Sequence, residues 1–391
     1  MTAPLVFPDG VSPDSFLHFF WQKRPLLMAG ALPGFSSPLS PDDLAGLSLE
    51  EGVESRIVEE TGRKKPWAVR HGPFDEKAYA KLPSTHWTLL VQDVDKLVPE
   101  VAALLDRFRF LPDWRVDDIM VSYAADQGSV GPHWDEYDVF LIQAMGRRRW
   151  QIAHERPAAD NVLPGLDLRI MRDFTPDTTW VLEPGDVLYL PPGIPRWGVA
   201  QGPCMTYSVG FRAPSLREML SSWFEGVLET VPEEHFRDGE MQLQAHSAEI
   251  TPAAMQRACE AVTRLASRPP EDYERWFGRF VTETKPNLTI EPRAGTVSTA
   301  ELRRLFEAHG VLHRHPFARM AFCPREDGTA WLFVNAHERT IVGEHRSFLH
   351  LLCQWRDLHF GYLAEWLDEP ACLALLTDLY NAGYYQAGHE G

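Results

Sequence analysis

Short apolar runs dominate the chain between about residues 87 and 212. They are rich in β-branched and aromatic residues, and turn residues such as Gly and Pro separate them. The runs are WTLLVQ, DIMVSYA, DVFLIQA, RRRWQIA, DTTWVL, DVLYL and MTYSVGFR. Many short strands at this spacing predict a barrel or a sandwich. The residues before them, with clusters such as Phe16, Phe19 and Phe20, predict a mixture of helix and loop.

After Pro214 the apolar positions recur with a period near 3.6, which predicts helices. The first helix carries one broad apolar face, made of Leu216, Met219, Leu220, Trp223, Phe224, Val227, Leu228 and Val231. Further helical stretches follow at 255–265 and 273–281, so residues 213–285 are expected to form a helical bundle. A face this broad either belongs to a simple core or pairs with a second copy, and we expect a homodimer through this region.

The sequence pattern of the last part of the chain predicts a small α+β domain over residues 296–391. A linker composition at 285–297 precedes it, and Ser298 and Glu301 have the spacing of a capping box at the start of a helix. Two strand-like runs, TAWLFV and RTIVG, and helices rich in Leu and Trp follow. The expected fold class is therefore α+β, with domains at 1–212, 213–285 and 296–391.

Composition is that of an ordinary globular protein, with 44% hydrophobic and 24% charged residues. No apolar run reaches the roughly 20 residues that cross a bilayer, and the first residues lack the basic and apolar segments of a secretion signal. The five cysteines are odd in number and widely spaced, which favours buried thiols over disulfides or a zinc site. We therefore expect a cytoplasmic protein that does not bind membranes.

The formal net charge of −17 bears on the choice of partner. A negative surface repels the phosphate backbone of nucleic acids and attracts basic proteins. The C-terminal residues 296–391 contain eight Arg and no Lys against twelve acidic residues, the opposite of a DNA-binding surface. We therefore expect a basic protein partner and no DNA.

The segment GPHWD is the first candidate for chemistry. In an extended segment side chains alternate, so His133 and Asp135 project to one face and Trp134 to the other. An imidazole and a carboxylate suit a divalent iron ion, and one further His would complete a facial triad. A single His-x-Asp pair is a weak signal, however, and taken alone it is more often structural.

A second candidate is the strand-like run RRRW, in which Arg148 shares the apolar face while its two Arg neighbours point the other way. A buried guanidinium requires an anion, and its fork binds carboxylates with two hydrogen bonds. The anion is either an internal Asp or Glu or a carboxylate-bearing cosubstrate. Thr206, Ser208 and Gly210 share one face of a later strand and could line a site for a small polar ligand, or be ordinary hydroxyls at the edge of the core.

Longer blocks of the sequence resemble the bacterial JmjC-type ribosomal oxygenases. The blocks are FWQKRPL, SPDDLAGL, HGPF, LPDW, GPHWDEYDVFLIQAMGRRRWQI, LEPGDVLYLPPGIP and YSVGFRAP. The resemblance covers essentially the whole chain. It implies a double-stranded β-helix of the cupin type, then a helical dimerisation region and a C-terminal winged-helix-like domain. It also implies an Fe(II)- and 2-oxoglutarate-dependent enzyme that hydroxylates an arginine of a basic large-subunit ribosomal protein.

The resemblance assigns roles to individual residues. It makes His133 and Asp135 metal ligands and places the distal carboxylate of 2-oxoglutarate on Arg148. Thr206 falls where the family carries a polar residue near the cosubstrate, and Ser208 lies on the same strand face.

One position departs from the family pattern. The family carries its third iron ligand as a His after Pro in the loop that follows LPPG, but this chain has Arg196, 63 residues after His133. A guanidinium remains protonated and has no lone pair to give to iron. We expect Arg196 to point into the barrel towards Asp135 and to compete with iron. Two functions remain open: an oxygenase, or a catalytically impaired pseudo-enzyme, natural or mutant, that binds a basic ribosomal protein without turnover.

Overall fold

The computed structural model describes residues 4–62, 66–166, 168–342 and 345–388. Contacts between residues divide the chain into two compact units, Met1–Ala213 and Pro214–Gly391. Each unit has its own hydrophobic core.

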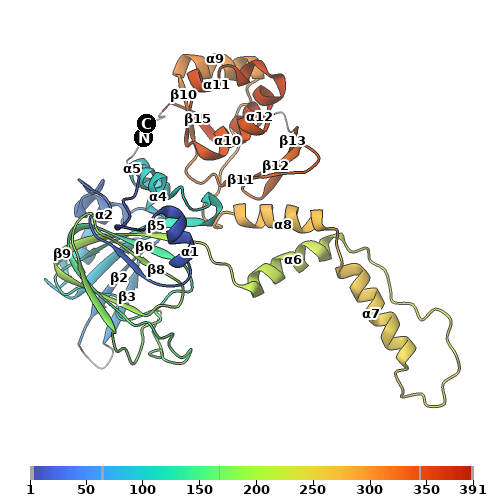
Figure 1. Cartoon of the computed structure of the whole chain (residues 1–391), viewed down its shortest axis with the longest axis horizontal. Coiled ribbons are helices and arrows are strands. Elements are labelled where there is room, and N and C mark those ends of the chain that lie inside the picture. Colours follow the sequence, from blue (N-terminus) through green and yellow to red (C-terminus); the bar gives the residue numbers. More distant parts are fainter. Residues whose placement is uncertain (1–3, 63–65, 167, 343–344, 389–391) are drawn as a thin grey trace. The chain divides into compact units, whose positions relative to one another are not determined.

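The first unit is built on one sheet that curls round on itself (Figure 1). Its order is β1-β8-β6-β9-β5-β4-β2-β3, and β7 also pairs with β6. The strand pairs of this sheet in the described residues are antiparallel, as a cupin-type barrel requires. The strands are β1 (Leu26–Met28), β2 (Ser55–Glu60), β3 (Trp67–His71), β4 (Trp87–Val91), β5 (Val116–Ala124), β6 (Val139–Ile152), β7 (Thr178–Leu182), β8 (Val187–Leu190) and β9 (Arg196–Phe211).

The strands expected between residues 87 and 212 are all present, but two of the expected runs, DVFLIQA and RRRWQIA, are parts of one long strand, β6. β6 continues through Gly146, where the sequence predicted a turn. Gly146 has a φ of 61°, and a Cβ on it would lie 2.2 Å from the carbonyl oxygen of Pro203 on β9. The register between β6 and β9 shifts on either side of this residue. The glycine therefore bends a continuous strand by a local irregularity instead of ending it.

The opening segment contains three strands that the sequence analysis did not predict. β2 pairs with both β3 and β4, and β1 pairs with β8. The run SRIVEE of β2 is short and rich in charge, so its intrinsic strand preference is weak. Pairing with distant strands supplies the stabilisation that the local sequence lacks, and the expectation of helix and loop alone was incomplete.

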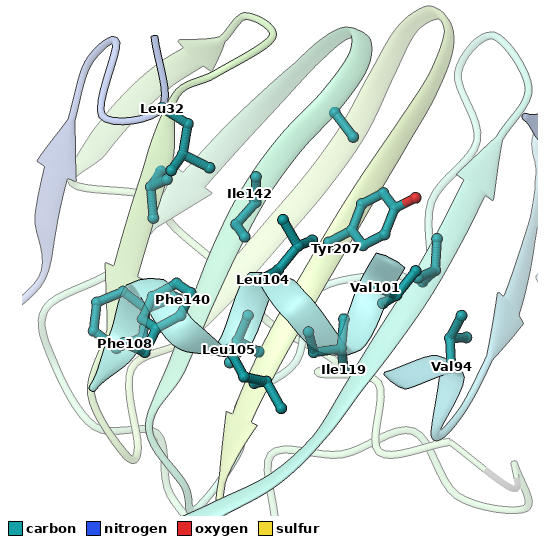
Figure 2. Close-up of a cluster of buried hydrophobic side chains, with 14 of the residues drawn as sticks. Leu32, Val94, Val101, Leu104, Leu105, Phe108, Ile119, Phe140, Ile142 and Tyr207 are labelled. Carbon is teal, nitrogen blue, oxygen red and sulfur yellow. The ribbon is translucent and has the colours of Figure 1, made fainter. Parts of the chain in front are cut away.

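Helices cover one face of the sheet. Figure 2 shows Val101, Leu104, Leu105 and Phe108 packed against the sheet, whose face here carries side chains such as Phe140. The helices of this unit are α1 (Pro13–Phe19), α2 (Pro41–Leu47), α3 (Glu76–Ala80), α4 (Val94–Leu97), α5 (Pro99–Ala102), η1 (Ala103–Phe108) and η2 (Asp113–Arg115).

The other face of β6 lines the barrel interior. Because side chains alternate along a strand, the neighbours of Phe140 point inward. A second buried cluster fills part of this interior: Val139, Leu141, Trp150, Ile152, Leu182, Leu188 and Leu190. The register shifts between Gln143 and Arg147 change which residues face inward, so beyond them Arg148 shares the inward face with Trp150 and Ile152. Arg148 is buried there, on the apolar face that the sequence predicted.

The second unit begins with three helices and continues with two small three-stranded sheets. Its first and fourth helices start at capping boxes, Ser215 with Glu218 and Ser298 with Glu301. No helix in the described ranges is both long and apolar enough to span a membrane. The elements are α6 (Leu216–Thr230), α7 (Pro252–Ala266), α8 (Pro270–Thr282), α9 (Thr299–His309), β10 (Val311–Arg314), β11 (Met320–Pro324), β12 (Thr329–Val334), β13 (His337–Val342), α10 (Arg346–Gln354), β14 (Asp357–His359), α11 (Phe360–Leu363), η4 (Trp366–Asp368), α12 (Pro370–Asn381) and β15 (Tyr385–Ala387).

The three predicted helices are present, but they do not form the expected compact bundle. α7 has no buried residue, and α6 buries only Val227. α6 meets α8 through the stacked rings of Trp223 and Tyr273. α8 packs instead on the sheet of β11, β12 and β13, where Gly278 leaves room for the ring of Phe333. The apolar face of α6 is too broad for the partners that the described residues provide, so four of its eight residues stay exposed: Leu216, Leu220, Phe224 and Leu228.

Candidate functional site

The predicted site residues meet where the segment before β6 lies against the start of β9. His133 and Arg196 are opposite one another in an antiparallel bridge, with N–O distances of 2.9 and 2.8 Å in the two directions. The amide of Gly193 donates to the carbonyl of Asp135 at 2.7 Å and extends this pairing. Directly opposite residues project their side chains to the same face. The backbone therefore presents His133, Asp135 and Arg196 to one another.

Arg196 forms an ion pair with Asp135, as the sequence predicted. Its Nη2 donates to Oδ2 of Asp135, and Arg196 is only 5% exposed. Desolvation is the largest single influence on Asp135 and would raise its pKa, but the charge and hydrogen bond of Arg196, together with His133 and a hydrogen bond from Tyr137, hold that pKa below its ordinary value. The carboxylate is therefore ionised at neutral pH and its charge is compensated by the guanidinium.

The imidazole of His133 is held in a defined orientation. Its Nδ1 lies 2.9 Å from the carbonyl oxygen of Gly131, and because a carbonyl can only accept, Nδ1 carries the proton. Nε2 is then the atom with a free lone pair. Desolvation, followed by the nearby Arg196 charge, lowers the pKa of His133 to about 4. The ring is therefore neutral at pH 7, the form that can bind a metal.

These three residues nevertheless do not fit an iron ion. His133 and Asp135 offer two donors, whereas a facial triad requires three. Arg196 has no lone pair, and its cation already occupies one oxygen of Asp135. Within the described ranges, no cluster of three or more His, Cys, Asp or Glu residues could hold a metal ion. The chemistry of the donor set therefore opposes metal binding at this position.

Arg148 lies deeper in the barrel and fits a carboxylate. It is 3% exposed, and no Asp or Glu of the described residues forms an ion pair with it. Its Nη1 lies 3.4 Å from Oγ of Ser122 and 3.5 Å from Oγ1 of Thr206, distances at the outer limit of hydrogen bonding. Burial lowers the pKa of Arg148, although a guanidinium keeps its proton. A buried cation with such weak partners is suited to an anionic ligand.

The hydroxyl residues divide into two groups. Thr206 is buried, contacts Arg148, and donates to Oε1 of Gln143 at 3.2 Å. Ser208 lies opposite Leu141 on the same face of β9, but it does not share this contact with Arg148.

Two further residues support Arg148 and were not found by sequence reasoning. Ser122 comes from β5, and Gly198 from β9 accepts from Nη2 of Arg148 at 3.4 Å. A Cβ on Gly198 would lie 2.8 Å from Nε of Arg148, so only glycine leaves room for the guanidinium. Nothing local in the sequence marks either residue, because both contacts depend on strand pairing.

Two family models match the chain. Residues 103–219 match the JmjC domain, and residues 260–386 match the ROXA-like winged helix. The predicted succession of a JmjC barrel and a C-terminal winged-helix-like domain is thereby confirmed.

Two individual relatives match large parts of the chain. The ribosomal protein uL16 3-hydroxylase of Escherichia coli is 38% identical over 374 residues, which is 95% of this chain and 96% of that protein. A probable ribosomal oxygenase of Haemophilus influenzae is 37% identical over 62% of this chain and 60% of its own length.

Solved structures agree with these matches. The X-ray structure of E. coli YcfD superposes with a TM-score of 0.85 at 36% identity and covers 98% of this chain and all of that one. YcfD in complex with cobalt and 2-oxoglutarate gives a TM-score of 0.82 at 35% identity, over 98% of this chain and 99% of the other. This chain therefore belongs to the JmjC-type ribosomal oxygenases, a family of 2-oxoglutarate-dependent dioxygenases.

Proposed function

We propose that this protein binds a basic, arginine-containing segment of a large-subunit ribosomal protein, and that Arg196 prevents iron-dependent hydroxylation of it. The relative that matches over 95% of the chain is named for the hydroxylation of ribosomal protein uL16. The net charge of −17 favours a basic partner. The observation that carries the proposal is the ion pair between Arg196 and Asp135.

Electrostatics decides between the metal and the guanidinium. At an effective dielectric constant of about 20, two unit charges ~4 Å apart interact by about 4 kcal/mol. Arg196 gains an interaction of this order with Asp135, and a divalent cation at the same place would be repelled by Arg196 instead. Iron would have to displace the guanidinium and would then find, among the described residues, only His133 and Asp135 as ligands. Arg196 thus stands where the family would place its third ligand, and it excludes the metal.

The part of the site that binds a carboxylate is retained. Arg148, with Ser122 and Thr206, supplies donors to the distal carboxylate of 2-oxoglutarate, and Ser208 lies further along the same face. When bound, iron supplies oxygen activation in this family. Without it, the protein can hold the cosubstrate and the peptide but cannot oxidise the latter.

The test compares the protein with Arg196→His. Binding of Mn²⁺, a redox-inert substitute for Fe(II), is measured by calorimetry, and consumption of 2-oxoglutarate is measured with Fe(II) and a basic uL16 peptide. We expect Arg196→His to bind Mn²⁺ at least about 100-fold more tightly, because an added ligand and a removed cation act in the same direction. Arg147→His is the control. It adds an imidazole at an exposed position outside the site and should bind Mn²⁺ no better than the unaltered protein does.

The alternative function is that of an active arginine hydroxylase, and the names of the relatives favour it. It predicts that the unaltered protein consumes 2-oxoglutarate and adds oxygen to the peptide at rates near those of Arg196→His. That result would overturn the proposal.

We also propose that the protein is a homodimer through residues 213–285 and meets its ribosomal partner in the cytoplasm. Leu216, Leu220 and Leu228 of α6 are 83%, 55% and 69% exposed, and a second copy would cover them. Light scattering should give twice the mass of one chain for the unaltered protein and the mass of a single chain for Leu220→Glu. A monomer at micromolar concentration would refute this assembly.

A further inference from the structure

A cavity lies at the end of the barrel sheet that β3 occupies. Its volume is about 810 Å³, within the range of about 300–1,000 Å³ for pockets that bind small ligands. Its lining comes from the end of β2, from β3, from the segment before β4 and from residues 165–166. The four residues of the barrel site are not among those that line it: His133, Asp135, Arg148 and Arg196. The barrel site therefore does not account for this cavity.

The lining of the cavity is acidic. Glu59 and Glu60 both belong to it, and none of the described residues that line it is a Lys or an Arg. Arg70 forms an ion pair with Glu59 at 3.0 Å, but no described residue forms a hydrogen bond or an ion pair with the carboxylate of Glu60. The cavity thus carries one negative charge without a counterion in the described part of the chain.

Trp67 adds an aromatic contact next to this charge. It lies directly opposite Glu60 in the pairing of β2 with β3, so both side chains project to the same face of the sheet. Trp67 also lines the cavity. A Lys or Arg side chain has an apolar stem and a cationic head, which an indole and a neighbouring carboxylate can contact together. The cavity is therefore suited to a basic side chain.

The backbone of β3 is free along its outer edge. β3 stands last in the order of the sheet and pairs with β2. The amide of Gly72 donates to the carbonyl of Ser55 on β2 at 2.9 Å. Residues that bond to the partner strand alternate in an antiparallel pair, so Trp67 and Val69 turn their N–H and C=O groups away from β2. Within the described ranges these outward groups have no hydrogen-bond partner.

The free edge and the cavity belong to one place, because Trp67 and Val69 both line the cavity. An unpaired strand edge can bind an extended peptide as an additional strand, and pockets beside the edge then hold alternate side chains of that peptide. β3 and the cavity supply both parts of such a site.

The wall of the cavity at His86 is held by the barrel. His86 has a φ of 65°, in the left-handed region that residues other than glycine rarely adopt. The amide of Glu60 donates to the carbonyl of His86, and the amide of His86 donates to the carbonyl of Asp126, both at 2.9 Å. These two hydrogen bonds fix the backbone of His86, so this side of the cavity is formed before a ligand binds.

The cavity adjoins the barrel site through Trp67. The indole packs against Gly131, since a Cβ at that glycine would lie 3.1 Å from it. Gly131 is two residues before His133, and its carbonyl accepts from the imidazole. One extended segment can therefore lie along β3 and continue towards the barrel.

We propose that the outer edge of β3 binds a stretch of the basic ribosomal protein as an added strand, and that the cavity holds a Lys or Arg side chain of this stretch at Glu60. The outward groups of Trp67 and Val69 bind the peptide backbone whatever its sequence, while Glu60 selects a cation. The net charge of −17 favours the approach of such a partner. The inference rests on the proposed function for the identity of the partner, and it adds the place and the manner of binding.

Fluorescence anisotropy with a labelled basic uL16 peptide tests the contact at Glu60. Glu60→Gln should weaken peptide binding about tenfold, because a charge-assisted pair is lost. The matched control Glu183→Gln makes the same change of charge at an exposed residue of the same unit, away from the cavity. It should bind the peptide within about twofold of the unaltered protein.

A set of peptides, each N-methylated at one backbone amide, tests the added strand. Methylation at every second residue of the bound stretch should weaken binding about tenfold, and methylation at the residues between them should leave it unchanged. Val69→Pro removes one outward N–H and spares the bonds to β2, since an edge strand accepts proline where the N–H faces outward. It should also weaken binding about tenfold, with circular dichroism showing that the variant is folded.

The other outcomes overturn the inference in ways that can be told apart. If the peptide binds the unaltered protein, Glu60→Gln and Val69→Pro alike, the site at β3 is refuted while the proposed function stands. If binding depends on Glu60 but N-methylation has no period of two, the added strand is refuted. If the peptide does not bind the unaltered protein at all, both proposals fail. If Val69→Pro lowers the mass measured by light scattering, the edge pairs with a second copy of the chain and not with the ribosomal protein.

Discussion

The ion pair between Asp135 and Arg196 can be measured by a double-mutant cycle. Asp135→Asn leaves the guanidinium of Arg196, which is 5% exposed, without a counterion. Removing one partner of a buried pair costs about 3–5 kcal/mol. Arg196→Met should cost less, because the side chain of Asp135 is 21% exposed and stays partly hydrated.

The double variant should be close to the unaltered protein in stability. Replacing a whole buried pair with neutral groups of similar size is often neutral, because the desolvation of both charges is removed together. The coupling between the two sites, the sum of the two single costs less that of the double variant, should then be at least about 3–5 kcal/mol, of the order expected for two charges near 4 Å at an effective dielectric constant of about 20.

Native-state hydrogen exchange of amides in β6 and β9 is a suitable assay. It reports the opening free energy of this unit separately from the C-terminal unit, whereas a single denaturation curve would combine them. Additive effects of the two single variants, with a coupling below about 0.5 kcal/mol, would refute the ion pair as an interaction that matters in solution.

Three further predictions follow from named contacts. The pKa of His133 is lowered to about 4 from 6.5, so the unfolded chain binds more protons between these values. The stability of the barrel should fall as the pH drops from 6.5 towards 4, and less so in His133→Gln, as measured by hydrogen exchange. Gly198→Ala places a Cβ 2.8 Å from Nε of Arg148, and should weaken calorimetric binding of 2-oxoglutarate about tenfold while the protein stays folded. Gly278→Ala places a Cβ 2.2 Å from the ring of Phe333, and thermal unfolding should show a loss of about 1–3 kcal/mol in the C-terminal unit.

The sequence determined the features that depend on local pattern. Alternation of side chains along a strand placed Arg148 on the apolar face of β6, and the structure buries it there. The 3.6-residue period identified α6, α7 and α8, and the capping-box spacing located the start of α9. The strand face, the helices and the helix start follow from a few neighbouring residues, so one chain without relatives reveals them. The ion pair between Arg196 and Asp135 was predicted in another way: the family resemblance placed Arg196 at the position of the third ligand, and the chemistry of a guanidinium did the rest.

Only the tertiary structure decided which distant residues meet. Asp135 and Arg196 are 61 residues apart, and the bridge between His133 and Arg196 brings them together. The strand β2 forms because β3 and β4 pair with it, although its own residues favour a strand only weakly. The exposed face of α6 likewise reflects partners that the described residues do not provide. Register, burial and the supply of partners are properties of long-range packing, and they decided that Arg148 is a buried cation with no carboxylate partner in the part of the chain that the structure describes.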